Sequence, residues 1–180
     1  MNREDDHILV RQCLQGNQKA FEEIVERYHK IIFNVGLRVL NNAEDAADVT
    51  QTAFLKAYKN LSKFNERYKF FSWLYKIAAN ESVNVLRQRK QTQGIDSGIV
   101  SVGKNPEEAY KDVELSEKIQ NALMKIELDY RVVIVLSHYQ ELSYDEISYV
   151  LDLPGKTVKS RLFTARKLLR DILRKEGVYD

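Results

Sequence analysis

The residues with the clearest capacity for chemistry lie near the end of this 180-residue chain. The segment from Pro154 to Lys175 carries eight basic side chains against the single acid Asp171, a net charge of +7. Cations held within a Debye length of phosphates, about 8 Å at physiological salt, attract a nucleic-acid backbone. A solvated basic face on a terminal helix is the alternative, because charge runs are common. The bases are Lys156, Lys159, Arg161, Arg166, Lys167, Arg170, Arg174 and Lys175.

The residues before this basic segment favour DNA binding over the solvated face. Ser143 is followed three residues later by Glu146, which is the spacing of a helix capping box. The chain then turns at Asp152 to Gly155, and helical spacing resumes from Thr157 to Leu173. Two helices joined by a tight turn are typical of a helix-turn-helix, whose second helix enters the major groove. The apolar side of that second helix is expected to be Val158, Leu162, Ala165, Leu169 and Ile172.

A second set of polar and aromatic residues follows Phe71 at helical spacing. It ends in the basic cluster Arg87, Arg89 and Lys90. Rings stack on single-stranded bases, amides read base edges and cations hold phosphates, so this mixture suits single-stranded nucleic acid. For Trp73 a place in the hydrophobic core is the better expectation. The further members are Tyr75, Lys76, Asn80 and Asn84.

Other chemistries have little support. Glu26 and His29 have the spacing found in di-iron bundles, but His7 and His138 have no Glu three residues before them to complete such a site. The single cysteine, Cys13, excludes a disulfide framework and a paired-cysteine metal site. No phosphate loop, dinucleotide fingerprint or esterase elbow occurs. We therefore expect no metal, no cofactor and no catalytic residue; a helical metal enzyme remains the remote alternative.

The elements that position these residues are predicted to be helices. Seven glycines and two prolines leave little turn chemistry for a many-stranded fold, so an all-α protein is expected. A leading helix is expected near residues 5–15, and Asn42 is a plausible N-cap for a helix with Asp45 at its third position. Three long apolar stripes predict the remaining helices of the first half. The first stripe is Phe21, Ile24, Val25, Tyr28, Ile31, Ile32, Val35 and Val39. The second is Ala46, Val49, Ala53, Phe54, Ala57, Tyr58 and Leu61, and the third is Phe71, Leu74, Ile77, Ala78 and Val85.

Three of the seven glycines and Pro106 fall between residues 91 and 106, which predicts a flexible linker. We divide the chain into a helical domain over 1–92, the linker over 93–112 and a second helical domain over 113–180.

The net charge of +2 is small because segments of opposite charge cancel. Residues 1–90 carry +4 and the basic C-terminal segment carries +7, whereas residues 91–153 are acidic. No signal peptide or membrane-spanning run occurs, so a cytoplasmic protein without membrane insertion is expected.

Three segments in this order resemble a known family. They are DAADVTQTAFLKAYKNL (45–61), FFSWLYKIAANESVNVLRQRK (70–90) and LSYDEISYVLDLPGKTVKSRLFTARKLL (142–169). Together they closely resemble the extracytoplasmic-function (group 4) sigma factors of the sigma-70 family. The resemblance implies a non-catalytic transcription initiation factor that directs core RNA polymerase to promoters and helps open the DNA.

The resemblance also implies roles for individual residues of the first domain, which looks like sigma region 2. Asp45, Asp48, Gln51 and Phe54 lie on the helix that docks on the polymerase beta-prime subunit. Without the resemblance, this face would be interpreted as a solvated surface. The loop over 62–70 and the following helix resemble the segments that capture a flipped base of the −10 element. Asn80 would contact that base, and Lys76, Asn84, Arg87 and Arg89 would hold flanking bases or phosphates.

The second domain looks like sigma region 4, which reads the −35 element. Lys159, Ser160, Phe163 and Thr164 align with base-facing positions, and Lys156, Arg161 and Arg166 are better placed for phosphates. The family usually has Pro-x-Gly-Thr-Val at the turn, whereas this chain has Gly155 one place earlier and Lys156 at the usual Gly position, so the turn geometry stays open.

The implied partners are core RNA polymerase, through its beta and beta-prime subunits, and promoter DNA. An anti-sigma protein is a further partner by family habit, although no residue identifies it. A DNA-binding regulator with a helical sensor domain remains the competing class, since it shares the C-terminal pattern but needs no polymerase-docking helix.

Overall fold

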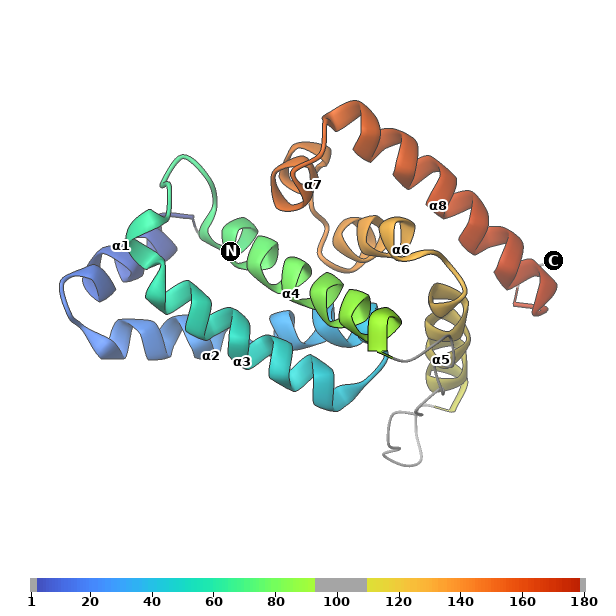
Figure 1. The fold of residues 1–180 in the computed structure, drawn as a ribbon, viewed down its shortest axis with the longest axis horizontal. Helices are drawn as coiled ribbons and strands as arrows, with labels where there is room; N and C mark the ends of the chain where they lie inside the picture. Colours follow the sequence, from blue (N-terminus) through green and yellow to red (C-terminus); the bar gives the residue numbers. More distant parts are fainter. Residues whose placement is uncertain (1–2, 93–109, 179–180) are drawn as a thin grey trace.

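A computed structural model describes residues 3–92 and 110–178, and within them the side chains of 5–89 and 115–178. The first domain contains α1 (Arg3–Leu14), α2 (Gln18–Leu40), α3 (Ala43–Lys59), a short 3-10 helix (Leu61–Lys63) and α4 (Phe70–Thr92). The second contains α5 (Tyr110–Met124), α6 (Leu128–Ile134), a π-helical turn (Val135–Tyr139), α7 (Tyr144–Leu151) and α8 (Gly155–Lys175). The described ranges contain helices and no strands, which confirms the all-α prediction (Figure 1).

The helix stripes of the first domain lie where the sequence places them. On α2 the residues Ile24, Tyr28, Ile32, Val35 and Val39 are buried, and they face α3 and α4. The predicted cap is present, because the side chain of Asn42 accepts a hydrogen bond from the Asp45 amide at 3.0 Å. Tyr58 is an exception, since half of it is exposed although its spacing predicts burial.

Gly36 allows α2 and α3 to approach each other closely. A Cβ atom at this position would lie 3.3 Å from the Ala46 Cα atom, which is tighter than most real contacts. Ala46 is itself fully buried, so the two small residues meet at the crossing point. This contact brings the start of α3, with its acidic and amide side chains, against the end of α2.

The helix-turn-helix is confirmed, with a turn that differs from the expected one in detail. Ser143 and Glu146 form the predicted capping box at the start of α7. Asp152, at φ 52°, is the left-handed residue that ends α7, whereas Gly155 does not have a positive φ. Pro154 precedes the first residue of α8, so this helix begins at Gly155, two residues before the predicted Thr157.

The predicted linker over 93–112 lies outside the described residues from 93 to 109. Its last three residues, 110–112, belong to α5. The boundaries that we assigned to the two domains therefore stay a proposal. Among the described residues, no helix is long and apolar enough to cross a membrane.

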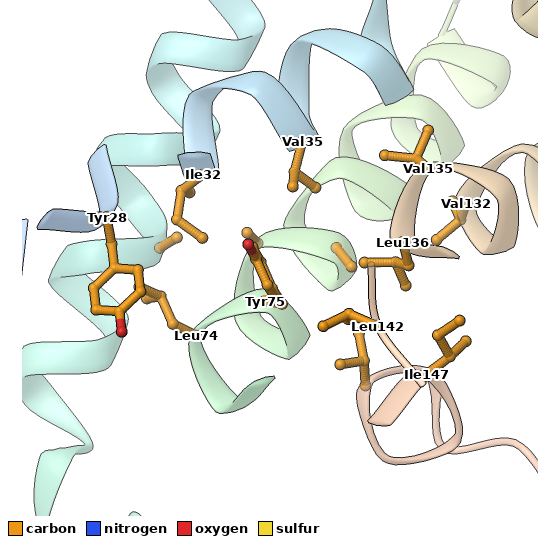
Figure 2. Packing of buried hydrophobic residues seen from close by; sticks show 14 of the residues in the cluster. Tyr28, Ile32, Val35, Leu74, Tyr75, Val132, Val135, Leu136, Leu142 and Ile147 are labelled. Atoms are coloured by element: carbon orange, nitrogen blue, oxygen red, sulfur yellow. The ribbon is translucent and has the colours of Figure 1, made fainter. Parts of the chain in front are cut away.

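The two domains pack against each other through a shared apolar core. Val35 and Tyr75 of the first domain and Leu136 and Leu142 of the second are all buried members of one connected cluster. Figure 2 shows these side chains together, at the place where α4 meets the second domain. At about 25 cal/mol per Å² of apolar surface removed from water, such burial stabilises the contact between the domains.

Candidate nucleic-acid interface

The predicted recognition helix α8 has one buried and one exposed face. Val158, Leu162 and Ala165 are buried against the domain. On the opposite side Lys159, Ser160 and Phe163 are exposed, and the ring of Phe163 is 74% exposed. An apolar ring this exposed on a basic helix can contact a thymine methyl group in the major groove. Lys156 is exposed in the first turn of the same face, and Thr164 is half-buried beside it.

Two arginines of α8 are held by neighbours from the same domain. Arg161 is half-buried and pairs with Asp129 at 2.9 Å. Arg166 is exposed, and its Nε atom donates to His138 Nε2 at 3.2 Å. Burial and the nearby Arg166 charge lower the pKa of His138, which keeps its imidazole neutral and able to accept this bond. Both arginines are thus fixed in place at the flank of the exposed row.

The expected −10 residues lie along one side of α4. Positions 76, 80, 84 and 87 follow one another at steps of four and three, so they share a face of the helix. Asn80, Asn84 and Arg87 are exposed. The other two cations of the set are engaged with carboxylates in this conformation: Lys76 pairs with Asp152 at 2.5 Å and Arg89 pairs with Asp45 at 2.5 Å.

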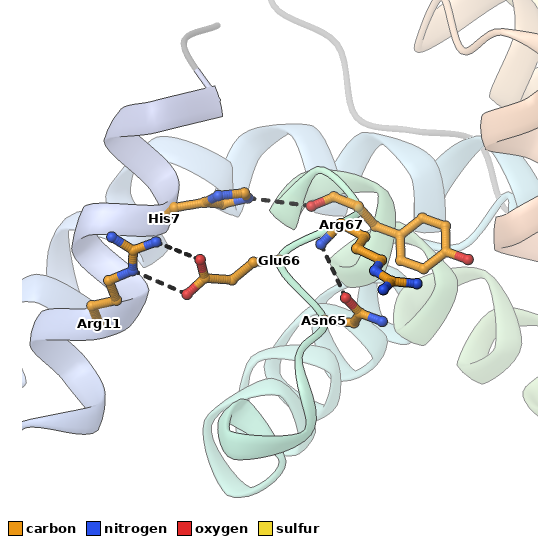
Figure 3. A network of polar contacts seen from close by, with 6 residues as sticks. His7, Arg11, Asn65, Glu66 and Arg67 are labelled. Atoms are coloured by element: carbon orange, nitrogen blue, oxygen red, sulfur yellow. Dashed lines mark hydrogen bonds and ion pairs between the residues drawn. The ribbon is translucent and has the colours of Figure 1, made fainter.

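The loop before α4 is held by two residues of α1 and by a hydrogen bond within the loop itself (Figure 3). Arg11 of α1 makes a two-pronged contact with Glu66, with Nε to Oε1 at 3.0 Å and Nη2 to Oε2 at 2.5 Å. This pairing lowers the pKa of the Glu66 carboxyl. His7 lies 3.2 Å from the backbone carbonyl of Tyr68, and the Asn65 side chain accepts from the Arg67 amide at 3.0 Å. Helix α1 therefore positions a loop that sequence reasoning assigned to base capture.

Aromatic side chains near this loop divide into core and surface. Trp73 is half-buried and packs on Phe64 and Phe70, as expected for a core residue. Tyr68 is 42% exposed and stacks on Tyr149 of α7, with ring centroids 3.9 Å apart. The sequence places Tyr68 in the loop but suggests no role for it. Its position beside Arg67 and Lys69, in a basic loop, was the only signal that it could belong to the nucleic-acid-binding surface.

The predicted polymerase-docking residues of α3 differ in exposure. Asp48 and Gln51 are exposed, whereas Asp45 is half-buried beside Arg89 and Phe54 is buried. Phe54 forms part of the wall of a groove of about 500 Å³ between α2 and α3. The other lining residues are Gln18, Phe21, Glu22, Val25, His29, Ala47, Gln51, Leu55 and Tyr58, so the half-exposed Tyr58 borders this groove.

The metal-site alternative gains no support from the geometry. Glu26 and His29 are both exposed, and the His29 ring stacks on Phe54 at 6.4 Å. Within the described part of the chain, no group of three or more His, Cys, Asp or Glu side chains is arranged to hold a metal ion.

Comparisons with known proteins agree with this geometry. Residues 24–92 match Sigma-70 region 2, and residues 116–169 match Sigma-70, region 4. The chain is 38% identical to the ECF RNA polymerase sigma factor SigW of Bacillus subtilis, over 92% of this chain and 95% of that protein. It is 34% identical to the ECF RNA polymerase sigma-E factor of Escherichia coli K12, over 91% and 92% of the two chains.

A solved structure gives the same result for the whole fold. CnrH, in complex with the cytosolic domain of CnrY, superposes with a TM-score of 0.74 at 27% identity, covering 95% of this chain and 98% of that one. Both matched regions, and the relatives that span nearly the full length, identify the same family. The chain therefore belongs to the extracytoplasmic-function sigma factors of the sigma-70 family.

Proposed function

We propose that this protein is a promoter-specificity subunit of RNA polymerase with no catalytic activity of its own. Helix α3 docks on the polymerase, the 62–70 loop and α4 hold the opened −10 element, and α8 reads the −35 element. The observation that carries this proposal is the exposed row Lys156, Lys159, Ser160 and Phe163 on the second helix of a helix-turn-helix. Family membership supports the same assignment.

Each surface has the chemistry that its proposed step needs. On α8, basic side chains attract phosphates and the central polar and aromatic side chains reach base edges. On α4, exposed amides and cations suit a flipped, single-stranded base, whose unstacking costs a few kcal/mol. On α3, the exposed Gln51 lines an apolar groove and Asp48 is exposed one turn before it; polar side chains beside an apolar patch are common at protein-docking sites.

The deciding experiment is transcription with purified core polymerase on genomic promoter fragments. We expect promoter-dependent transcripts, and we expect the double substitution Asp48→Ala, Gln51→Ala to reduce polymerase affinity by about tenfold or more, the range of an interface hot spot. Substitution of one exposed acid and one exposed amide elsewhere, Glu117→Ala with Gln12→Ala, is the matched control and should have no effect. A regulator of the repressor type would bind DNA, give no transcripts and be insensitive to both pairs of changes.

The −35 assignment makes a separate prediction about selectivity. If Lys159 contacts a base, Lys159→Ala will reduce the difference in binding between matched and mismatched −35 elements by about 1 to 3 kcal/mol. Arg166→Ala, at the flank of the row, will weaken binding to all sequences alike. It will also reduce the slope of log affinity against log salt concentration by about 1, because one counterion fewer is released. Competition binding with a panel of single-base variants at several salt concentrations measures both effects. Equal loss on matched and mismatched sites for Lys159→Ala would refute the base contact.

A further inference from the structure

The exposed face of α8 is bordered at one end by another element of the same domain. Lys159, Phe163 and Arg166 follow one another at steps of four and three residues, so they share one face of the helix. At the Arg166 end of this row α8 contacts the π-helical turn over Val135–Tyr139. The turn continues α6, which packs along α8 (Figure 1). A residue outside α8 can therefore take part in binding at this edge.

Two side chains of the π-helical turn contact Arg166. Its Nε atom donates to His138 Nε2 at 3.2 Å, and its Nη2 atom lies 3.5 Å from the Ser137 hydroxyl. Arg166 and His138 are both exposed, whereas Ser137 is half-buried. A guanidinium has five N–H donors, and these contacts use two of them. A guanidinium and an imidazole thus lie side by side at the surface.

The turn itself is held on both sides of His138. Leu136, before it, is buried in the core, and Tyr139, after it, lies with its ring centre 4.7 Å from the Arg38 guanidinium of α2. The chain therefore leaves the core at Leu136 and presents His138 at the surface beside α8. Turns of this π-helical kind are frequent at functional sites.

Each element packed against the turn contributes a charged side chain. These are Arg38 of α2, Arg131 of α6, Glu146 of α7 and Arg166 of α8, and the exposed Glu141 follows in the next loop. Glu146 is paired with Lys69 at 2.8 Å. Among the described residues, no carboxylate pairs with His138 or Arg166. The surroundings of the imidazole are therefore predominantly positive and suit an anion.

The contact between His138 and Arg166 depends on the protonation of the imidazole. Burial and the Arg166 charge lower the pKa of His138, so its ring is neutral at pH 7 and accepts from Arg166. An anion placed against both side chains reverses this balance, because an opposite charge within about 4 to 6 Å favours the protonated form. The protonated ring donates from both nitrogens, so the bond between the two side chains is exchanged for one bond from each to the anion.

We propose that His138 and Arg166 together form a phosphate site at the edge of the −35 surface, and that His138 takes up a proton when a DNA phosphate enters it. The proposal rests on the proposed function, since it adds a residue outside α8 to the surface assigned to the −35 element. In a helix-turn-helix the first helix crosses the DNA backbone, and the π-helical turn comes directly before that helix, α7. A phosphate contact carries no sequence information, so the site strengthens binding to all sequences alike.

The direction of the pH dependence follows from the linkage between proton and phosphate. Because the phosphate raises the pKa of His138 in the complex, DNA affinity rises as the pH falls through that value, and it levels off below the pKa of the free protein. We expect the full-length protein to bind a matched −35 duplex about tenfold more tightly at about pH 5.5 than at about pH 8, the ratio for a shift of one pH unit. The slope of log affinity against log salt concentration should steepen by about 1 at the lower pH, because one more cation contacts the backbone.

The variant His138→Gln tests the proton. A glutamine amide can accept from Arg166 but takes up no proton in this pH range, so we expect the rise in affinity at about pH 5.5 to disappear. Glu141→Gln, which removes a neighbouring exposed charge and leaves the imidazole in place, is the matched control and should keep the rise. A flat pH profile for the parent protein, or the same rise in His138→Gln, would overturn the proposal. Thermal melting at both pH values verifies folding.

A direct measurement uses the parent protein. NMR of the imidazole C–H signals, recorded during a pH titration with and without the duplex, reports the protonation midpoint of each histidine. The signal that is missing in His138→Gln identifies His138, and His7 and His29, both in the first domain, serve as internal references. We expect the midpoint of His138 to rise by about one pH unit when the duplex is bound. A midpoint that does not move would contradict proton uptake.

The outcomes separate this inference from the proposed function. If Lys159→Ala changes sequence selectivity while the pH profile of the parent protein is flat, the phosphate site is wrong and the proposed function stands. If the rise at low pH occurs on matched and mismatched duplexes alike and disappears in His138→Gln, the site is supported as a phosphate contact. If the protein binds no duplex at either pH, the −35 assignment fails, and the phosphate site fails with it.

Discussion

Replacement of Arg131 by methionine is expected to lower the free energy of unfolding by about 3 to 5 kcal/mol, the largest effect of any single substitution outside the apolar core. Arg131 is only 9% exposed, and among the described residues no carboxylate pairs with it. Its guanidinium donates instead to four backbone carbonyls: those of Leu123 and Met124 at 3.0 Å, Ile126 at 3.0 Å and Val39 at 2.8 Å. Methionine would fill the volume but remove this donor from all four carbonyls, of which, within the described ranges, only that of Leu123 also accepts from the nearby Ile126 amide, at 3.1 Å.

The four carbonyls explain why an arginine is needed here. Leu123 and Met124 lie at the end of α5, where carbonyls lack the usual helical donor four residues on and the helix dipole favours a cation. The Val39 carbonyl belongs to α2, so the same side chain also joins the two domains. Burial lowers the pKa of Arg131 to about 10, so the guanidinium stays charged at neutral pH. A lysine would present its donors from a single point and could not reach carbonyls that lie in several directions.

Chemical denaturation of the variants at pH 7 measures this effect. Lys125→Met is the matched control, because Lys125 is exposed and pairs with Glu176 at the surface. Exposed pairs contribute about 1 kcal/mol or less, so the control should remain close to the parent protein. A loss for Arg131→Met no larger than for Lys125→Met would show that the buried bonds contribute little.

Arg131 also illustrates what the sequence could not reveal. The burial of Val133, Ile134 and Leu136 around it follows from their helical spacing, because apolar periodicity indicates the buried face of a helix. The burial of an arginine depends on where other helices end in space, and residues 39 and 131 are far apart in the chain. Local signals were more informative: the caps at Asn42 and Ser143 were both predicted from residue type and spacing, and both are present.

The same distinction applies to the proposed binding surfaces. The exposure of Lys159, Ser160 and Phe163 follows from the period of α8, so the sequence was sufficient to find that face. The expected roles of Lys76 and Arg89 rest on the family resemblance and stay predictions. Their carboxylate partners, Asp152 and Asp45, lie on other helices, and only the tertiary structure brings these charges together.

The contact that places α1 should have the second-largest effect. Asp6 is 2% exposed, and it accepts hydrogen bonds from Tyr28 Oη at 2.5 Å and from Arg27 Nη1 at 2.7 Å. Burial and this bond raise the pKa of Tyr28, so its hydroxyl stays protonated and needs an acceptor. We expect Asp6→Ala to lower the free energy of unfolding by about 2 to 3 kcal/mol, because it leaves the buried hydroxyl without a partner.

A double-mutant cycle separates this explanation from simple loss of packing. If the orphaned hydroxyl causes the loss, Asp6→Ala with Tyr28→Phe will cost less than the sum of the two single substitutions, with a coupling of about 1 kcal/mol or more. Glu23→Ala, which removes the exposed second partner of Arg27, is the control and should change stability by about 0.5 kcal/mol at most. Additive costs for Asp6 and Tyr28 would refute the explanation.

The Asp6 substitution also has a functional consequence that stability alone would not produce. Helix α1 carries His7 and Arg11, which hold the loop at Tyr68 and Glu66, so a loosened α1 releases the loop proposed to capture the −10 base. We therefore expect Asp6→Ala to weaken binding of a −10 strand while leaving −35 duplex binding unchanged, because the residues proposed to read the −35 element lie on α8, in the other domain. If binding to both elements falls equally, the substitution has caused a general loss of folded protein. If the added Tyr28→Phe change restores −10 binding, the buried hydrogen bond is linked to the order of the loop.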